Sequence, residues 1–484
     1  MKEINTLGQL KSSGYRVKQI KDEMRDNLIT ALKNKVNIFE GIHGFDDTVI
    51  PDLERAILSK HHILLLGLRG QAKTRIARLL VRLLDEYIPI IKGSEINDDP
   101  FHPLSPFGKA TIQNLGDDTP IDWIYRDDRY VEKLATPDVS IADLIGDVDP
   151  IKAATLKLPY ADERVIHYGL IPRANRSLFV INELPDLQPR IQVSLFNILQ
   201  EGDIQIRGFK VRLPLDILFL FTANPEDYTN RGSIITPLKD RIDSQIITHY
   251  PLDIDIAKKI TEQEAKVKPG QKNVVVPEII KVLLEQISFE ARTSEFIDTN
   301  SGVSARLGIS AYENLLSAVE RRMLKNNEST GIARLSDLVG VVPAITGKVE
   351  LVYEGEQQGP YKVAFELINK AVKTEFLKYF PHPEKLKKND RDPYGVIKAW
   401  FAGEHELKMS VDATDLEYHQ SLSQVSGLER LIAKGAELSD TEKPIFKELV
   451  LHGLASFNII NKELHQTRIE FSDLLGDMDK ELDD

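Results

Sequence analysis

The chain has 484 residues, a net charge of −12 and no cysteine; 42% of its residues are hydrophobic and 28% are charged. This composition is typical of a globular protein of about two to four domains, and it excludes disulfides, thiolate zinc sites and cysteine nucleophiles. No apolar run approaches the roughly 18 residues of a membrane span, and the N-terminal residues lack the apolar core of a signal peptide, so we expect a cytoplasmic protein. The negative charge argues against a protein that binds nucleic acid by bulk electrostatics.

The first 37 residues predict a helical extension. Ile20, Met24 and Leu28 recur at the spacing of one helix face, so we expect this helix to pack on the main body or on a neighbouring subunit. A loop with several glycines follows at residues 38–51. It either closes over an adenine base or simply connects two elements.

A strand, a glycine-bearing loop and a helix then follow one another. Ile63–Leu66 is an unbroken apolar run, and Arg75–Leu84 carries apolar residues at helical spacing. This order is typical of a phosphate-binding P-loop, in which Lys73 reaches the β/γ oxygens and Thr74 offers its hydroxyl to Mg²⁺. Ala72 stands where a second glycine is usual, and we expect it to be tolerated with a negative φ. The candidate nucleotide-binding residues are Gly67, Leu68, Arg69, Gly70, Gln71, Ala72, Lys73, Thr74 and Arg75. An ordinary strand-to-helix turn is the alternative.

The next hundred residues predict strands with inserts. Residues 88–91 predict a second strand, and residues 92–122, rich in Pro, Gly, Asn and Asp, predict a long irregular insertion. Residues 123–134 predict a hairpin around Asp127-Asp128. A short helix is expected after residue 150, and residues 165–170 predict an arm of another hairpin.

A second chemical motif lies at the end of another apolar strand. Ser177–Ile181 predicts a buried parallel strand, and Asn182 and Glu183 follow at its carboxyl end, where ligands bind in open α/β sheets. P-loop ATPases normally carry Asp-Glu at this point. Asn182 keeps a carbonyl acceptor for a metal-bound water but brings no negative charge, whereas Glu183 keeps the role of the base that polarises the attacking water. A surface Asn-Glu pair is the alternative.

Two further polar residues follow in the next elements. After a predicted β-hairpin at residues 204–213, residues 215–221 predict a strand that leads to Asn224. If this strand neighbours the strand of Glu183, Asn224 is well placed to orient the attacking water. Residues 234–242 then predict a short helix with Arg241 at its end, where a cation is more often simply solvated.

In this order the elements resemble those of the AAA+ ATPases, and within them the clade of the magnesium chelatase AAA+ subunit and the MoxR-type ATPases. The resemblance to this clade rests on Leu144–Asp149 and Gly169–Arg176, which flank what resembles the family's insert, and on Gly302–Leu307, which resembles its sensor-2 segment. The resemblance covers roughly residues 38–345. It implies that Arg306 is directed at the γ-phosphate.

The expected fold is α/β. It comprises a helical N-terminal extension (1–37), a P-loop AAA+ core with a parallel sheet and β-hairpin inserts (38–250), an α-helical lid (251–350) and a helical C-terminal region with an acidic end (351–484). The tail beyond residue 351 resembles nothing that we recognise, and we expect it to serve oligomerisation or docking.

The resemblance implies an enzyme that hydrolyses ATP with Mg²⁺ in a ring, expected to be a hexamer, and remodels or activates a protein client. Asn182 would support the metal, Asn224 would position water, and Arg241 would reach the neighbouring subunit's γ-phosphate. ATPases of this clade usually act with a von Willebrand factor A domain on a separate chain, and the metal-ion adhesion motif of that domain is absent here. Three alternatives stay open: a true magnesium chelatase subunit of tetrapyrrole synthesis, a DNA-binding remodeller that uses the hairpin Arg207–Arg212, and an ATP-binding scaffold that barely hydrolyses.

Overall fold

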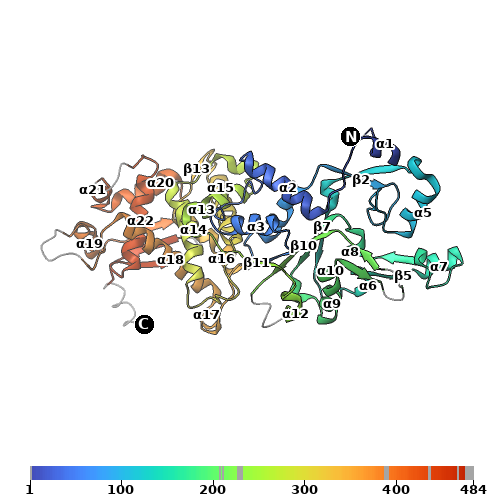
Figure 1. Cartoon of the computed structure of the whole chain (residues 1–484). Coiled ribbons are helices and arrows are strands. Elements are labelled where there is room, and N and C mark those ends of the chain that lie inside the picture. Colours follow the sequence, from blue (N-terminus) through green and yellow to red (C-terminus); the bar gives the residue numbers. More distant parts are fainter. Residues whose placement is uncertain are drawn as a thin grey trace. The chain divides into compact units, whose positions relative to one another are not determined.

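The computed structural model of the chain describes residues 3–206, 209, 212–225, 233–385, 392–433, 438–465 and 468–474. The chain forms two compact units, Met1–His249 and Tyr250–Asp484 (Figure 1). Each unit has its own hydrophobic core. The first unit carries the P-loop and the second carries Arg306.

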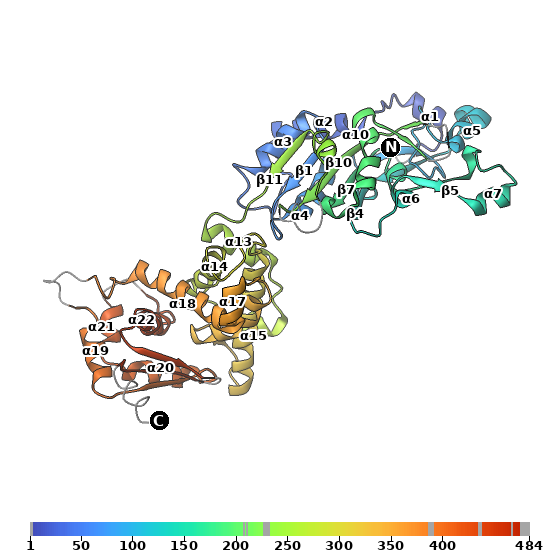
Figure 2. The same cartoon turned by 90° about the horizontal axis from the view of Figure 1, so that it is seen from below.

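A five-stranded parallel sheet forms the centre of the first unit, with the strand order β11-β1-β10-β7-β4 (Figure 2). The P-loop strand β1 therefore lies between β10 and β11, and β7 lies on the other side of β10. Because the strands are parallel, their carboxyl ends meet at one edge of the sheet. The strands are β1 (Ile63–Leu66), β4 (Tyr130–Leu134), β7 (Ser177–Asn182), β10 (Ile217–Ala223) and β11 (Ser244–Ile247).

Helices cover both faces of this sheet. Leu65 of β1 packs in one buried cluster with Met24 and Leu53, whereas its neighbour Leu64 belongs to a second cluster with Ile171 and Ile191. Alternate residues of a strand point to opposite faces, so both faces are buried, as the unbroken apolar runs predict. The first face carries α2 (Ile20–Lys33), α3 (Val49–Leu58) and α4 (Lys73–Leu79); the second carries α6 (Ile141–Leu144), α8 (Leu170–Arg173), α9 (Pro189–Ser194) and α10 (Phe196–Glu201).

Among the described residues of the first unit, the remaining elements are short helices and three two-stranded pairs. The pairs are β2–β3, β5–β6 and β8–β9, and all three are antiparallel. The pair β5–β6 contains the hairpin arm expected at residues 165–170, and β8–β9 corresponds to the hairpin expected at residues 204–213. The bounds are α1 (Leu7–Ser12), β2 (Tyr87–Ile91), α5 (Pro106–Leu115), β3 (Ile121–Tyr125), β5 (Gly146–Val148), α7 (Pro150–Leu156), β6 (Ile166–Tyr168), β8 (Asp203–Gln205), β9 (Arg212–Pro214) and α12 (Thr236–Lys239).

The hairpin predicted at residues 123–134 is wrong. β3 pairs with β2, and β4 instead joins the main sheet as a parallel neighbour of β7. Arg129, just before β4, is 1% exposed; its guanidinium binds both carboxylate oxygens of Glu23 in α2 at 2.6 and 2.8 Å and the carbonyl of Arg176 at 2.8 Å. This buried pair fixes the chain at the point where a hairpin would have to turn back.

The insertion at residues 92–122 is also more regular than predicted, because it contains α5. The hydroxyl of Ser105 accepts a hydrogen bond from the Gly108 N–H at 2.8 Å, and Pro106 occupies the first turn, so Ser-Pro starts a helix here rather than a loop. The buried carboxylate of Asp98 accepts hydrogen bonds from the N–H groups of Leu104 and Ser105 at 2.6 and 2.9 Å. Asp98 thereby fixes the start of α5.

The second unit is mainly helical and has one continuous core. Buried residues of α14, α15, α18 and α22 all belong to a single hydrophobic cluster, which crosses the predicted boundary between residues 350 and 351. The helices are α13 (Ile254–Glu264), α14 (Glu278–Arg292), α15 (Arg306–Asn326), α16 (Val342–Thr346), α17 (Tyr353–Gln358), α18 (Pro360–Tyr379), α19 (Gly395–Ala402), α20 (Asp415–Gln424), α21 (Leu428–Ile432) and α22 (Lys443–Ser456).

Strands were not predicted in the C-terminal region, but it contains a three-stranded antiparallel sheet of order β14-β16-β15. Its strands are β14 (Leu407–Ser410), β15 (Asn461–Leu464) and β16 (Arg468–Ser472); a shorter pair joins β12 (Val274–Val275) and β13 (Gly331–Ile332). Residues 475–484, which include most of the predicted acidic end, lie outside the described residues.

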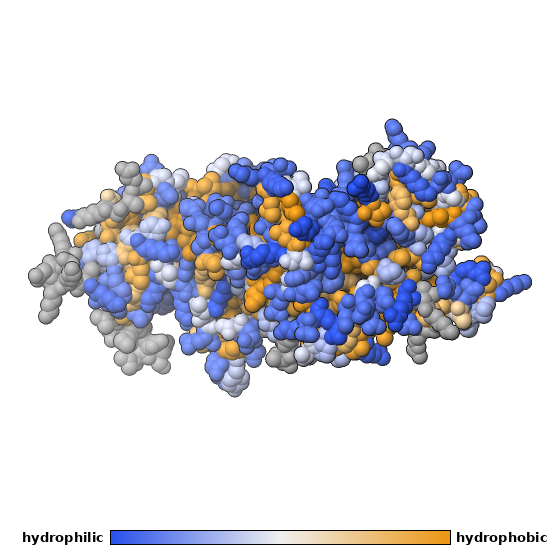
Figure 3. Space-filling view, in the orientation of Figure 1, coloured by the Kyte–Doolittle hydropathy of each residue, from blue (hydrophilic) through white to orange (hydrophobic). Residues whose placement is uncertain are grey.

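The surface of the chain is mostly hydrophilic on the face shown in Figure 3, with smaller hydrophobic patches among the polar residues. Over the described ranges, no helix is both long enough and apolar enough to cross a lipid bilayer.

Candidate functional site

The P-loop is positioned by the buried strand β1, which ends at Leu66, and by α4, which begins at Lys73. The first loop residue must be a glycine: a Cβ atom on Gly67 would lie 2.0 Å from the hydroxyl of Thr248 and 2.2 Å from Oε1 of Gln71. The same two side chains are hydrogen-bonded to each other at 2.7 Å, and both are buried. The start of the loop is therefore held against the chain that follows β11.

Ala72 contradicts the expectation of a negative φ. Its φ and ψ are 56° and 13°, which is the left-handed conformation that glycine adopts freely and other residues adopt at a cost of roughly 1–2 kcal/mol. The loop therefore keeps the backbone of a second glycine although the residue is alanine.

Lys73 is buried, and its ammonium group is directed back into the loop. It donates hydrogen bonds to the backbone carbonyls of Gly67 and Leu68, the latter at 3.0 Å, and to Oδ1 of Asn224 at 2.8 Å. Thr74, the next residue of α4, is exposed. Lys73 and Thr74 thus place an ammonium group and a hydroxyl at adjacent positions at the start of one helix, as a phosphate and metal site requires.

Asn224 and Glu183 lie together although they are far apart in the sequence. β10 and β7 are adjacent parallel strands, so their carboxyl ends meet, and Nδ2 of Asn224 donates to a carboxylate oxygen of Glu183 at 3.0 Å. Glu183 has a φ of 55°, a second left-handed residue at this edge. Strained backbone of this kind gathers at functional sites. Lys73, Asn224 and Glu183 form one continuous hydrogen-bonded chain.

Asn182 is nearly buried, with 9% of its surface exposed, and both ends of its amide group are occupied. Its Oδ1 accepts from the hydroxyl of Thr222 at 3.2 Å, and its Nδ2 donates to Oε1 of Glu132 in β4. The same Thr222 hydroxyl accepts from the Glu183 N–H at 3.1 Å. Glu132 was not predicted as a site residue because residues 130–134 were assigned to a hairpin arm.

The remaining candidate residues lie elsewhere. Arg241 follows α12 and contacts its own chain: it donates to Gln200 at 3.1 Å and to the Pro237 carbonyl at 2.7 Å, and it lies 4.9 Å from the ring centre of Phe196. Arg306 is exposed and begins α15 in the second unit. Of the hairpin Arg207–Arg212, positions 207, 208, 210 and 211 lie outside the described residues.

The oxygen atoms at the sheet edge are the kind that Mg²⁺ binds. Hydroxyl, amide and carboxylate oxygens are its preferred protein ligands, and here they come from Thr74, Asn182, Glu132 and Glu183. The donor set therefore fits a magnesium ion that accompanies a bound nucleotide.

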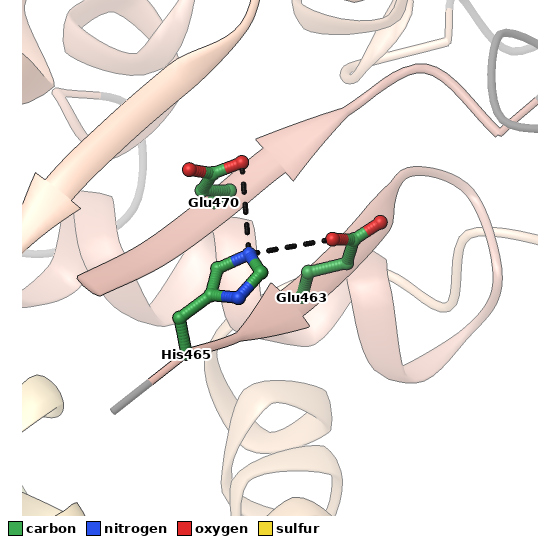
Figure 4. Close-up of side chains that lie close together, drawn as sticks. All are labelled: Glu463, His465 and Glu470. Atoms are coloured by element: carbon green, nitrogen blue, oxygen red, sulfur yellow. Dashed lines mark ion pairs between the residues drawn. The ribbon is translucent and has the colours of Figure 1, made fainter. Parts of the chain in front are cut away.

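A second group of possible metal ligands lies on the hairpin β15–β16 of the second unit. Nε2 of His465 is 3.4 Å from Glu463 and 3.8 Å from Glu470 (Figure 4). Arg468 already pairs with Glu470 at 2.5 Å, and the side chains of Glu463 and His465 are about half exposed. We interpret this group as the charged outer face of the hairpin.

Comparison with known proteins agrees with this arrangement, although no family model matches the chain. The chain is 26% identical over 212 residues to the magnesium-chelatase 38 kDa subunit of Cereibacter sphaeroides, a match of 42% of this chain and 56% of the relative. This similarity supports the predicted resemblance to the AAA+ ATPases of the magnesium chelatase and MoxR-like type. The predicted fold class, an α/β P-loop AAA+ core with a helical region after it, is confirmed.

Two further similarities are more limited. The chain is 32% identical over 114 residues to the hydrogenase transcriptional regulatory protein HoxA of Cupriavidus necator, which covers 22% of this chain and 24% of that protein. A chain from the complex between subunits BchI and BchD of magnesium chelatase matches 66% of this chain and 98% of its own length at 18% identity, with a TM-score of 0.33, too low to carry an argument. The chain thus spans about half of one curated relative and a quarter of the other.

Proposed function

We propose that this AAA+ chain binds ATP with Mg²⁺ and hydrolyses it in a ring-shaped oligomer, expected to be a hexamer. The observation that supports this best is the hydrogen-bonded chain from Lys73 through Asn224 to Glu183. It brings the phosphate-binding lysine of the P-loop and the carboxylate of a second strand to one edge of the sheet. An ordinary strand-to-helix turn would have no reason to meet a carboxylate in this way.

Each residue has a separate part in this proposal. Lys73 and the N–H groups of the loop bind the phosphates, and Thr74 and Asn182 hold the magnesium ion, which would neutralise phosphate charge when bound. Glu183 polarises the attacking water, and Asn224 orients it. Arg241 from a neighbouring subunit and Arg306 from the same subunit would contact the γ-phosphate.

The process that ATP hydrolysis would drive is proposed from the resemblance to the family alone. Members of this group are expected to remodel or activate a protein client in the cytoplasm, with a von Willebrand factor A domain partner on a separate chain. The identity to the magnesium-chelatase subunit favours one second candidate, a chelatase subunit of tetrapyrrole synthesis. Co-purification from the native cell separates the two: a von Willebrand factor A protein that is not a chelatase component supports the first, and chelatase subunits support the second.

The hydrolysis proposal is tested by phosphate release from Mg·ATP. Glu183→Gln keeps the size and hydrogen bonding of the side chain but loses the base, so turnover is expected to fall about 10²-fold or more while ATP binding, measured by calorimetry, persists. Glu201→Gln at the exposed end of α10 is the matched control and keeps full turnover. Wild-type protein that binds ATP but releases no phosphate would support the scaffold alternative instead.

A further inference from the structure

Asn182 leaves the proposed magnesium site one negative charge short, and its surroundings supply a replacement. The amide group of Asn182 is oriented by two partners: Thr222 donates to its Oδ1, and its Nδ2 donates to Oε1 of Glu132. The carboxylate of Glu132 therefore lies in direct contact with the residue at which a carboxylate is missing. Glu132 reaches this point from the neighbouring strand β4.

The backbone explains how Glu132 reaches so far. Leu134 is the partner of Asn182 in the β4–β7 register, so Glu132 sits two residues before the carboxyl end of its strand, on the same face as that end. Strand side chains stand roughly perpendicular to the sheet and lean along the strand, and that of Glu132 meets Asn182 at the edge. About a quarter of the side chain, 23%, is exposed, so the carboxylate is accessible at the site and not sealed in the core.

The other contacts of Glu132 direct it toward the helix that carries Thr74. Its Oε2 accepts from the Tyr130 hydroxyl at 3.1 Å and from Nη2 of Arg78 at 3.2 Å. Arg78 is four residues after Thr74 in α4, so both lie on one face of that helix. Glu132 is thus held between the amide of Asn182 and the helix face of Thr74.

Asn182 and Glu132 also depend on each other chemically. An aspartate at position 182 would bring two carboxylates within hydrogen-bonding distance, and like charges so close cannot both stay ionised. The amide of Asn182 instead donates to the carboxylate and leaves Oδ1 as an acceptor. The carboxylate therefore lies on β4 and not on the adjacent strand β7.

We propose that Glu132 supplies the carboxylate of the Mg²⁺–nucleotide site that position 182 lacks, and that it acts together with the carbonyl oxygen of Asn182 on the water shell of the ion. This inference rests on the proposed function, because it requires a nucleotide at the P-loop. It adds a residue that the pattern of P-loop motifs does not contain. Mg²⁺ keeps several of its waters in such sites, so an indirect contact is sufficient.

The test moves the negative charge from position 132 to position 182. Glu132→Gln removes the charge but keeps an acceptor for Asn182, and the double variant Glu132→Gln/Asn182→Asp returns the charge on the other strand. Binding of Mn²⁺, a spectroscopic substitute for Mg²⁺, is followed by electron paramagnetic resonance on full-length protein saturated with ADP. We expect Glu132→Gln to weaken Mn²⁺ binding by on the order of tenfold or more, and the double variant to recover most of the loss.

Two further measurements separate the possible outcomes. Asp122→Asn, at an exposed position of β3, removes the same net charge and is expected to leave Mn²⁺ binding unchanged. ADP binding in excess chelator should be equal in all variants. Unchanged Mn²⁺ binding in Glu132→Gln, or an equal loss in the double variant, would overturn the role of Glu132 while the nucleotide site stands. Wild-type protein that binds no nucleotide would overturn the proposed function and this inference together.

Discussion

The ammonium group of Lys73 lies 2.8 Å from Oδ1 of Asn224, and the amide nitrogen of the same asparagine lies 3.0 Å from the carboxylate of Glu183. Asn224 therefore bridges the cation that would meet the phosphates and the carboxylate that would activate water. Both its oxygen and its nitrogen are used, so an aspartate or a leucine could not replace it. The bridge connects three separate segments of the chain at one sheet edge.

The first prediction concerns Lys73. Lys73→Ala removes the ammonium group that the loop carbonyls and Asn224 hold in place, so ATP binding measured by calorimetry should weaken at least about tenfold. Lys109→Ala, at an exposed position of α5, is the matched control and should bind ATP like the wild type. An unchanged affinity of Lys73→Ala would remove the P-loop assignment.

The second prediction follows from the left-handed backbone of Ala72. Glycine adopts a φ of 56° without the clash of a Cβ atom, so Ala72→Gly should raise the free energy of unfolding by up to about 1 kcal/mol. Ala110→Gly, at an exposed helical position of α5, should lower it by about 1 kcal/mol because glycine is a poor helix former. Urea denaturation of both variants measures these opposite changes in the free energy of unfolding. A loss of stability in Ala72→Gly would show that the methyl group makes contacts worth more than the strain.

Three of the five strands of the central sheet, β1, β7 and β10, were predictable because they carry clear sequence signals. β1, β7 and β10 are apolar runs with glycine or polar residues at their carboxyl ends, and the parallel arrangement follows from the helices between them. The position of Asn224 at the end of a strand next to that of Glu183 was likewise predicted from the two strand ends. The roles of the individual site residues stay predictions.

The errors have local physical causes. Glu132 was missed because β4 and β3 both look like hairpin arms. The buried pair that holds them apart joins Arg129 to Glu23, 106 positions away in the chain, and local sequence does not reveal such a contact. The φ of Ala72 depends on how the loop closes and not on residue type. The sheet of the C-terminal region was missed because strands such as Asn461–Leu464 are short and polar, with little β propensity.

The third prediction is a pH dependence centred on Asp216. Its carboxylate accepts a hydrogen bond from the Ile20 N–H at 2.8 Å at the start of α2, but burial raises the pKa of Asp216 to about 6. Between about pH 4 and pH 6 the folded chain therefore binds more protons at this group than the unfolded chain. Stability should fall as the pH rises through this window, by roughly 1–3 kcal/mol from this group.

Asp216→Asn isolates the contribution of Asp216. The amide keeps an oxygen for the Ile20 N–H but does not titrate, so the variant should lose this downward slope, measured by urea denaturation at about pH 4.5 and pH 7. Asp122→Asn is the control and should retain the wild-type slope. If Asp216→Asn keeps the same slope as the wild type, other groups cause the pH dependence.

The last prediction separates two roles for Arg241. Within its own chain Arg241 contacts Gln200, the Pro237 carbonyl and the ring of Phe196, and such a half-exposed cation–π contact is worth roughly 0.5–1 kcal/mol. If these contacts are its whole purpose, Arg241→Ala should lower stability by about that amount and leave turnover nearly unchanged.

If Arg241 instead acts on the neighbouring subunit's nucleotide, Arg241→Ala rings should bind ATP normally but lose about 10³-fold or more of their turnover. Mixing them with Lys73→Ala subunits should restore part of the activity, because some interfaces then combine an intact P-loop with an intact arginine. Glu201→Gln subunits, mixed with Lys73→Ala subunits in the same way, serve as a control for subunit exchange. No recovery in rings shown to be mixed would place the action of Arg241 within its own subunit. Turnover that stays constant per subunit on dilution below ring assembly would refute the shared site itself.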